Sequence, residues 1–237
     1  MSTPPPPGAS GAGHITPAPT SQADIDLLRP LVHTWAAGEP MWHVYNVGYG
    51  ARDFYSGDPA NPGTWGRFHP FIPVGGTDPL PVYYAANDVL GALAETVFHD
   101  VPAGPKKAKR VPFAKLRHRL EVAVESTRDL KLADLRGFGT KRLGVSRAEL
   151  LESGPPAYAE TAPWGRALHA HPENVDGMVW VSRQHDMSQS VVLFGDRVSA
   201  GDLAVVEEHI PLTLAAGNGL ELVLAAANQA DITITGL

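Results

Sequence analysis

Strand-like and helix-like segments follow one another irregularly in this chain, and that irregular order most limits the folds open to it. Short segments rich in β-branched and aromatic residues indicate strands, and they lie at 41–48, 81–86, 119–126, 129–135, 177–184 and 189–196. Helical patterns are predicted at 88–99, at 146–153, in the segment 158–171 with a start near Thr161 or Pro163, and at 201–209. Since there is no regular strand–helix–strand repeat, we expect an α+β fold rather than a doubly wound sheet.

The two ends of the folded part are harder to assign. Residues 23–38 carry apolar side chains at helical spacing, with Pro30 breaking the helix. Residues 219–237 are predicted to form a β-hairpin.

Between 51 and 81 lies a long Gly- and Pro-rich connection, and such loops are usually functional or disordered. The segment TWGRF within it suggests an ordered part.

The first residues differ in composition from the rest. Six of the first twenty residues are proline, and no Lys, Arg or apolar core accompanies them. We therefore expect residues 1–22 to be a disordered tail, not a signal peptide. Residues 23–237 are expected to form a single catalytic domain.

Charge and composition exclude several classes of function. The chain has 25 acidic and 19 basic residues, a net charge of −6, which argues against direct nucleic-acid binding. No apolar run is long enough to cross a bilayer. The absence of cysteine removes disulfides, thiolate metal sites and cysteine nucleophiles, and fits a cytoplasmic protein. The basic stretch 104–119 is interpreted as a solvated surface loop, with an anionic-ligand site as the alternative.

Common catalytic motifs are missing. The sequence contains no phosphate loop, no dinucleotide-binding glycine motif, no HExxH and no nucleophile elbow. His169 and His171 are two residues apart, so a helix would place them on different sides, and we predict no metal site there. Any chemistry must come from carboxylates, Arg, His, Tyr and hydroxyl groups.

Glu95 is the most informative of these groups. On a helical wheel of residues 88–99 the apolar residues share one side, whereas Asp88, Gly91, Glu95 and His99 share the other. A solvated glutamate would explain this position. However, Gly91 allows a close approach to the polar side, and the preceding strand brings two tyrosines to the same end of the unit.

The order of several short motifs resembles a known family. An aromatic-led strand (WHVY) precedes an Arg in a Gly-containing loop (GRFHP), a strand ending in VYYAA and the segment ALAETVFHD. YAETAPWGRALH, DGMVWVSRQ and VVLFGDR follow in that order. From Met41 to Arg197 the chain resembles the RES domain family.

The resemblance implies both a fold and an activity. Members of that family are similar to ADP-ribosyltransferases, with a split, mostly antiparallel β-sheet, flanking helices and a cleft that holds NAD⁺. Many are toxins that consume NAD⁺ by phosphorolysis or hydrolysis. Their partner is an antitoxin with an Xre-type helix-turn-helix domain. NAD⁺ is thus expected as substrate, with inorganic phosphate as a possible co-substrate, and no prosthetic group or metal is expected.

The family's functional residues map onto this sequence at several positions. Glu95 matches the family glutamate, which would stabilise the positive sugar formed when nicotinamide leaves. Arg67 matches a basic position that could grip the pyrophosphate, although a surface arginine is an equal alternative. Tyr84 matches the strand tyrosine, which could stack on nicotinamide or bond a ribose hydroxyl.

Three further positions depart from the family pattern or leave it open. His43 stands where the family usually has its first Arg, and a neutral histidine cannot form a bidentate contact. The family serine has two candidates. One is Thr161 at an expected helix start, where it could equally be an N-cap. The other is Ser182 in WVSRQ.

Three functions remain open at this stage. The first is an enzyme that cleaves the nicotinamide–ribose bond of NAD⁺ with phosphate or water as acceptor. The second is a transferase that places ADP-ribose on a macromolecule. The third is a catalytically impaired domain that binds a nucleotide or a partner. An exported effector is an alternative setting to a toxin–antitoxin pair.

Overall fold

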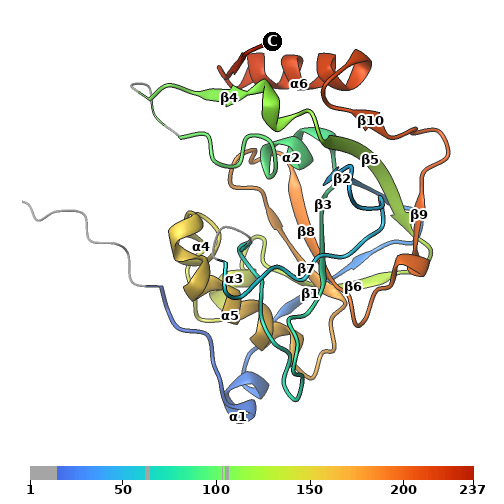
Figure 1. Cartoon of the computed structure of the whole chain (residues 1–237). Coiled ribbons are helices and arrows are strands. Elements are labelled where there is room, and N and C mark those ends of the chain that lie inside the picture. The colour runs from blue at the N-terminus through green and yellow to red at the C-terminus, as the bar shows by residue number, and fades with distance from the viewer. Residues whose placement is uncertain (1–14, 62–64, 103, 105–106) are drawn as a thin grey trace, which may run out of the picture.

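The computed structural model describes residues 15–61, 65–102, 104 and 107–237. A nine-stranded sheet dominates it, with the order β1-β6-β7-β8-β3-β2-β5-β10 and β9 beside β5 (Figure 1). The strands of this sheet are β1 Leu31–Trp35, β2 Pro40–Asn46, β3 Val82–Ala86, β5 Arg119–Ser126, β6 Leu130–Asp134, β7 Gly177–Val181, β8 Gln189–Phe194, β9 Leu203–Val205 and β10 Leu212–Thr213. A separate two-stranded sheet pairs β4 Arg110–Pro112 with β11 Thr233–Thr235.

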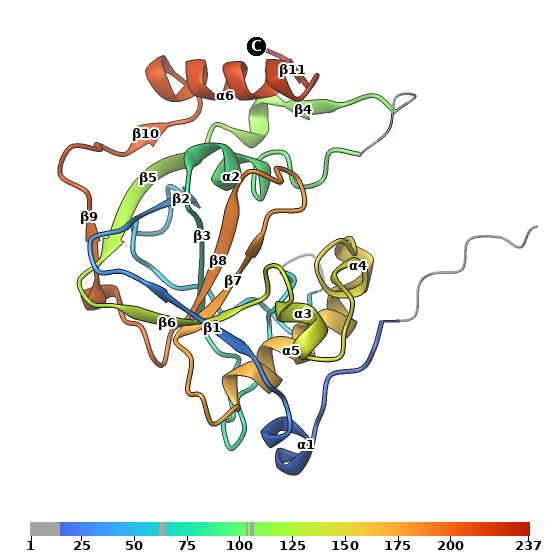
Figure 2. The same ribbon diagram turned by 180° about the vertical axis from the view of Figure 1, so that it is seen from behind.

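Helices flank the sheet at both ends. The α-helices are α1 Gln22–Asp26, α2 Val89–Ala94, α3 Gly139–Arg142, α4 Arg147–Leu150, α5 Tyr158–His169 and α6 Gly217–Gln229. The short 3₁₀ turns among the described residues are Phe113–Lys115, Pro155–Ala157 and Ala200–Asp202. Viewed from behind, α6 lies across one end of the molecule, and α1, α3, α4 and α5 gather toward the other (Figure 2). Within the nine-stranded sheet the only parallel pair of described strands is β6–β7. The predicted α+β class and mostly antiparallel sheet are confirmed.

The sheet divides between β2 and β3. Strand β2 pairs with β5 along its whole length, but it pairs with β3 only at Trp42 and Ala86. Beyond that pair a side chain replaces the ladder, since His43 Nδ1 lies 2.6 Å from the carbonyl oxygen of Tyr84. The two halves of the sheet therefore separate there.

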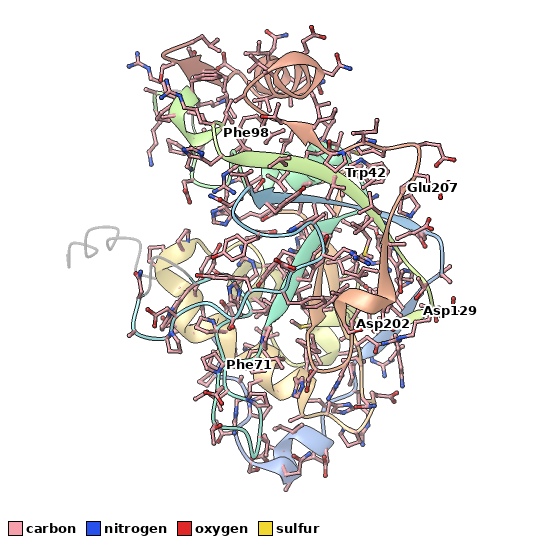
Figure 3. All side chains as sticks on the ribbon, turned by 45° about the vertical axis from the view of Figure 1, so that its right-hand side comes forward. Trp42, Phe71, Phe98, Asp129, Asp202 and Glu207 are labelled. Carbon is pink, nitrogen blue, oxygen red and sulfur yellow. The ribbon has the colours of Figure 1, made fainter. Side chains whose placement is uncertain are left out.

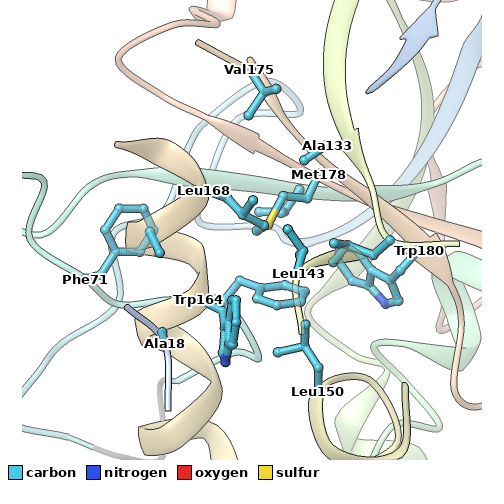
Figure 4. Close-up of a cluster of buried hydrophobic side chains, with 14 of the residues drawn as sticks. Ala18, Phe71, Ala133, Leu143, Leu150, Trp164, Leu168, Val175, Met178 and Trp180 are labelled. Atoms are coloured by element: carbon cyan, nitrogen blue, oxygen red, sulfur yellow. The ribbon is translucent and has the colours of Figure 1, made fainter. Parts of the chain in front are cut away.

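Apolar clusters fill both ends of the molecule. One surrounds α5 and includes Trp164, Leu168, Met178 and Trp180 (Figure 4). Another lies below α6 and includes Phe98 (Figure 3). Together these clusters fix helices α2 and α5 against the sheet, on either side of its division.

Part of the expected tail is folded. Residues 1–14 lie outside the described residues, but Ile15 and Ala18 are buried, and Ala18 belongs to the cluster around Trp164 (Figure 4). Trp164 Nε1 donates to the Thr16 carbonyl at 3.1 Å, and Thr16 donates to Glu149. The expectation of disorder is wrong for residues 15–22, because contacts with α4 and α5 hold an extended segment that needs no regular structure of its own.

Three element predictions are also wrong. The expected break at Pro30 is present, but the residues after it form β1 instead of a second helical part, because they pair with β6. The helix expected over 201–209 is a 3₁₀ turn followed by β9, which pairs with β5. The expected C-terminal hairpin is α6 and β11, since its Leu- and Ala-rich part favours a helix.

Candidate functional site

A cleft of about 590 Å³ opens where β2 and β3 separate. Strands β2, β3, β7 and β8 contribute to its walls, together with the segment after α2, the loop 65–69 and the start of α5. Its lining residues are Trp42, Val44, Tyr55, Trp65, Gly66, Arg67, His69, Tyr84, Ala85, Ala92, Glu95, Thr96, His99, Asp100, Lys115, Arg119, Pro155, Tyr158, Trp180 and Ser190. Glu95, Arg67 and Tyr84, three residues predicted from the sequence, thus line one cavity.

Glu95 is half-buried and held at one oxygen. Helix α2 ends at Ala94, and Glu95 is its C-cap. Its Oε1 accepts hydrogen bonds from Ser182 Oγ at 2.6 Å and from the Arg183 amide at 3.0 Å. Within the described part of the chain no hydrogen bond reaches Oε2. The carboxylate is therefore oriented by the protein and keeps one oxygen for a ligand.

Ser182 organises the turn that holds Glu95. Its side chain is almost fully buried and accepts from the amides of Gln184 and His185 at 3.2 and 3.1 Å. Because its own hydroxyl hydrogen goes to Glu95, Ser182 connects the end of β7 to the carboxylate. Of the two candidates for the family serine, Ser182 is the one that contacts Glu95.

The other end of α2 is fixed to the same turn. Asp88 caps the helix by accepting from the Gly91 amide at 2.7 Å, and Ser188 Oγ lies 2.7 and 2.8 Å from its two carboxylate oxygens. The close approach that Gly91 permits is to Ser188, because a Cβ at Gly91 would lie 2.6 Å from the Ser188 Cβ. Both ends of α2 are thus attached to the β7–β8 connection.

Arg67 brings a buried cation to the cleft. It is 4% exposed, and Nη1 donates to the Leu150 carbonyl at 3.0 Å and to Ser153 Oγ at 3.1 Å. Burial lowers the pKa of its guanidinium, and no described carboxylate lies within ion-pair distance. The alternative of a surface arginine is wrong. A buried cation without a paired carboxylate is suited to an anionic ligand.

Tyr84 forms the floor beside Arg67. Its hydroxyl accepts from the Phe68 amide at 3.2 Å and lies 3.1 Å from His69 Nδ1. Burial raises the pKa of Tyr84 and lowers that of His69 to about 4, so both are neutral near pH 7. Two lining residues carry buried polar atoms, His69 Nε2 and Ser190 Oγ, that have no hydrogen-bond partner among the described residues. Such atoms are expected where a ligand or water completes the site.

His43 and Thr161 are not among the lining residues. Side chains alternate along a strand, so Trp42 and Val44 line the cleft, whereas His43 packs against Tyr45 and Tyr83. The expectation that His43 contacts the substrate is therefore not supported by its position. Thr161 lies inside α5, not at its N-cap. It donates to the Arg67 carbonyl at 2.6 Å and so supports Arg67 indirectly.

A hydrogen-bonded series that the sequence did not reveal lies along the wall of the cleft. His99 Nδ1 lies 2.9 Å from Asp100 Oδ1, and His99 Nε2 lies 2.6 Å from Tyr158 Oη. The Arg67 guanidinium carbon is 5.4 Å from the centre of the Tyr158 ring. His99 shares the polar side of the predicted helix with Glu95, but Tyr158 is distant in sequence, and no local motif connects the two.

The basic stretch contributes two further cations. Lys115 and Arg119 line the cleft, and Lys115 Nζ is 3.2 Å from Asp100 Oδ2. The interpretation of residues 104–119 as a surface loop is therefore incomplete. Among the described residues no group of three or more His, Asp or Glu side chains could hold a metal ion. No described helix has the length and apolar character needed to span a membrane.

Comparison with known families and structures identifies a family and a similar fold. The family model described as the RES domain matches residues 40–215. A chain in the crystal structure of the M. tuberculosis MbcT-MbcA toxin-antitoxin complex superposes with a TM-score of 0.53 and 18% sequence identity. The match covers 82% of this chain and 92% of that one. No curated protein matches.

Proposed function

This chain belongs to the RES domain family, and from that premise we propose that it degrades NAD⁺ by cleaving the bond between nicotinamide and ribose. The observation that carries the proposal is the half-buried carboxylate of Glu95. Ser182 and the Arg183 amide hold it at Oε1, and it faces a cleft that also contains Arg67 and Tyr84. Phosphorolysis and hydrolysis are the two forms this reaction can take.

The chemistry requires a fixed negative charge near the sugar. Nicotinamide leaves as a neutral base with the electron pair of the carbon–nitrogen bond, so positive charge develops on the ribose. A carboxylate oriented before the reaction stabilises that charge without reorganising. Glu95 Oε2, which accepts no hydrogen bond from the described part of the chain, is the atom assigned to this task.

The cleft also suits the rest of the dinucleotide. Its volume of about 590 Å³ lies within the usual range for small-molecule sites. Lining cations Arg67, Lys115 and Arg119 outnumber the carboxylates of Glu95 and Asp100, which favours a pyrophosphate. Indole and phenol rings of Trp42, Trp65 and Tyr84 offer stacking surfaces for the two bases.

Incubating the purified protein with NAD⁺, with and without inorganic phosphate, tests the proposal. Released nicotinamide supports glycosidic cleavage, and the second product identifies the acceptor, ADP-ribose for water and ADP-ribose-1″-phosphate for phosphate. Intact NAD⁺ after incubation with folded, partner-free protein contradicts the proposal. The alternative of an impaired domain arose because His43 stands where the family usually has its first Arg. His43 packs on the face of β2 away from the cleft, so its position does not favour that alternative.

We also propose a partner. The superposed chain comes from a toxin-antitoxin complex, and an enzyme that removes NAD⁺ in the cytoplasm endangers the cell that makes it. A cognate antitoxin, with an Xre-type helix-turn-helix domain, would cover the cleft. Expression of this protein alone should stop growth and lower cellular NAD⁺, and co-expression of the antitoxin should restore both.

A further inference from the structure

Asp100, His99 and Tyr158, called here the relay, form a continuous hydrogen-bonded series along one wall of the cleft. Asp100 is also paired with Lys115 at 3.2 Å, which keeps it charged. Because a carboxylate only accepts, His99 Nδ1 carries the hydrogen that faces Asp100. Nε2 is then free of hydrogen and accepts from the Tyr158 hydroxyl.

The relay is attached to the same turn as Glu95. Gln184 Nε2 and Arg183 Nη2 donate to the His99 carbonyl at 2.7 and 3.3 Å. The Arg183 amide and Ser182 hold Glu95. One turn therefore fixes both the carboxylate and the relay on the cleft wall.

The surroundings of Tyr158 distinguish it from a structural tyrosine. Its side chain is almost fully buried, yet it lines the cleft with Glu95. Burial raises its pKa, Arg67 and Arg183 act in the opposite direction, and Glu95 raises it further. Tyr158 thus interacts electrostatically with both the carboxylate and the cations of the site. This is the position expected of a group that takes part in the reaction.

We propose that Tyr158 is a catalytic residue that removes the proton of a neutral acceptor, and that His99 and Asp100 act through it as positioning residues. The inference rests on the proposed function and assigns the acceptor side of that reaction. The water oxygen bonds to the ribose carbon that nicotinamide leaves. Its proton passes to Tyr158 Oη, while the phenolic hydrogen moves to His99 Nε2. The imidazolium, paired with Asp100, then releases the proton to solvent.

This mechanism treats neutral and anionic acceptors differently. Water must lose a proton as it bonds to the sugar, so it needs the relay. Phosphate dianion and azide attack through an atom that carries no proton, so they do not need it. The relay therefore affects hydrolysis selectively, which no general loss of structure would do.

The test measures both reactions in the same variants. Tyr158→Phe and His99→Gln are incubated with NAD⁺ in buffer alone, and with saturating phosphate or azide, and the products are separated by chromatography. We expect hydrolysis to fall by ~10²-fold, the lower end for a positioned acid–base group, while the reactions with the anions change little. Tyr49→Phe and His118→Gln alter exposed residues as matched controls and should behave like the parent.

Other outcomes overturn the relay. It is excluded if hydrolysis and the anion reactions fall in parallel in folded variants, if neither falls, or if the parent shows no hydrolysis at all. Thermal unfolding of each variant identifies loss of fold. A parent that releases no nicotinamide with any acceptor contradicts the proposed function itself, so the two failures are distinguishable.

Discussion

At the scale of single residues, the substitution Glu95→Gln removes the negative charge of the carboxylate and keeps its hydrogen-bonding geometry. In Glu95→Gln the amide oxygen can still accept from Ser182 and the Arg183 amide, as Oε1 does now. Only the negative charge near the sugar is lost. We expect the rate of NAD⁺ consumption to fall by ~10²–10⁴-fold, with little change in thermal stability, measured by nicotinamide release and by circular dichroism.

Glu207→Gln provides the matched control, because Glu207 is exposed at the edge of the molecule (Figure 3) and lies outside the cleft. It should consume NAD⁺ at the parent rate. If folded Glu95→Gln consumes NAD⁺ at the parent rate, Glu95 does not have the catalytic role proposed for it.

Residues of the candidate site could be predicted from the sequence where they belong to a short motif. Glu95, Arg67 and Tyr84 stand in motifs that can be compared with the family, and all three line the cleft. His99 and Tyr158 are joined only by the fold, at 2.6 Å, so no motif could reveal them. His43 was expected at the substrate only because it stands where the family has its first Arg, and sequence alone does not say which face of an isolated strand meets the cavity.

At the scale of elements, the packing of α2 on the β7–β8 connection depends on Gly91. A methyl group there would lie 2.6 Å from the Ser188 Cβ and 3.0 Å from the Ala86 Cβ. Gly91→Ala gains helix propensity of about 1 kcal/mol, but overpacking of this kind costs about 1–3 kcal/mol. We expect a lower free energy of unfolding and reduced activity, since α2 carries Glu95 at its end.

Gly201→Ala is the control for this change. Its added Cβ would have its nearest neighbour at 3.5 Å, and the turn is exposed. Denaturant unfolding of both variants measures the effect. Equal stability of Gly91→Ala and the parent would mean that the cost of overpacking against Ser188 and Ala86 does not exceed the gain in helix propensity.

The junction of β2 and β3 is expected to weaken in acid. Burial lowers the pKa of His43 from 6.5 to about 4, despite its hydrogen bond to Tyr84. Between these values the unfolded chain binds a proton at this residue and the folded chain does not. The free energy of unfolding therefore falls as pH is lowered from about 6.5 to about 4.

His43→Asn isolates this contribution, because an amide can still donate to the Tyr84 carbonyl but does not titrate. Its unfolding free energy, measured by urea titration across that pH range, should depend less steeply on pH than the parent's. His69 and His169, whose pKa values are also lowered, contribute equally to both proteins. Parallel pH curves would show that His43 is not the group responsible.

Elements were predictable where local pattern and pairing agree. The strands at β2, β3, β5, β6, β7 and β8 were all expected, and so was α4, which the structure shows to begin with a Ser146–Glu149 capping box. Predictions failed where a distant partner decides the outcome. Residues 203–205 begin after a turn with helix-like capping, yet pairing with β5 makes them a strand.

At the scale of the whole molecule, folded structure begins earlier than composition suggests. Proline-rich segments cannot form helix or sheet, which is why disorder was expected through residue 22. The structure buries Ile15 and Ala18 and bonds Thr16 to Trp164 and Glu149, so tertiary contacts alone hold this segment. Residues 15–20 form no helix or strand, but composition says nothing about such contacts.

The cleft joins residues from Trp42 to Ser190 across both halves of the sheet, so a bound dinucleotide should stabilise the entire fold. A ligand at a hundred times its Kd adds about 2.7 kcal/mol to the free energy of unfolding. Glu95→Gln is the suitable protein, because the proposed function predicts that it keeps the cleft and consumes NAD⁺ far more slowly than the parent. We expect NAD⁺ to raise its melting temperature, as measured by scanning calorimetry, and nicotinamide alone to raise it far less. Combining Glu95→Gln with Arg67→Met should remove most of the NAD⁺ shift, because the buried cation would no longer meet the pyrophosphate. If NAD⁺ leaves the melting temperature of folded Glu95→Gln unchanged, the dinucleotide does not occupy this cleft.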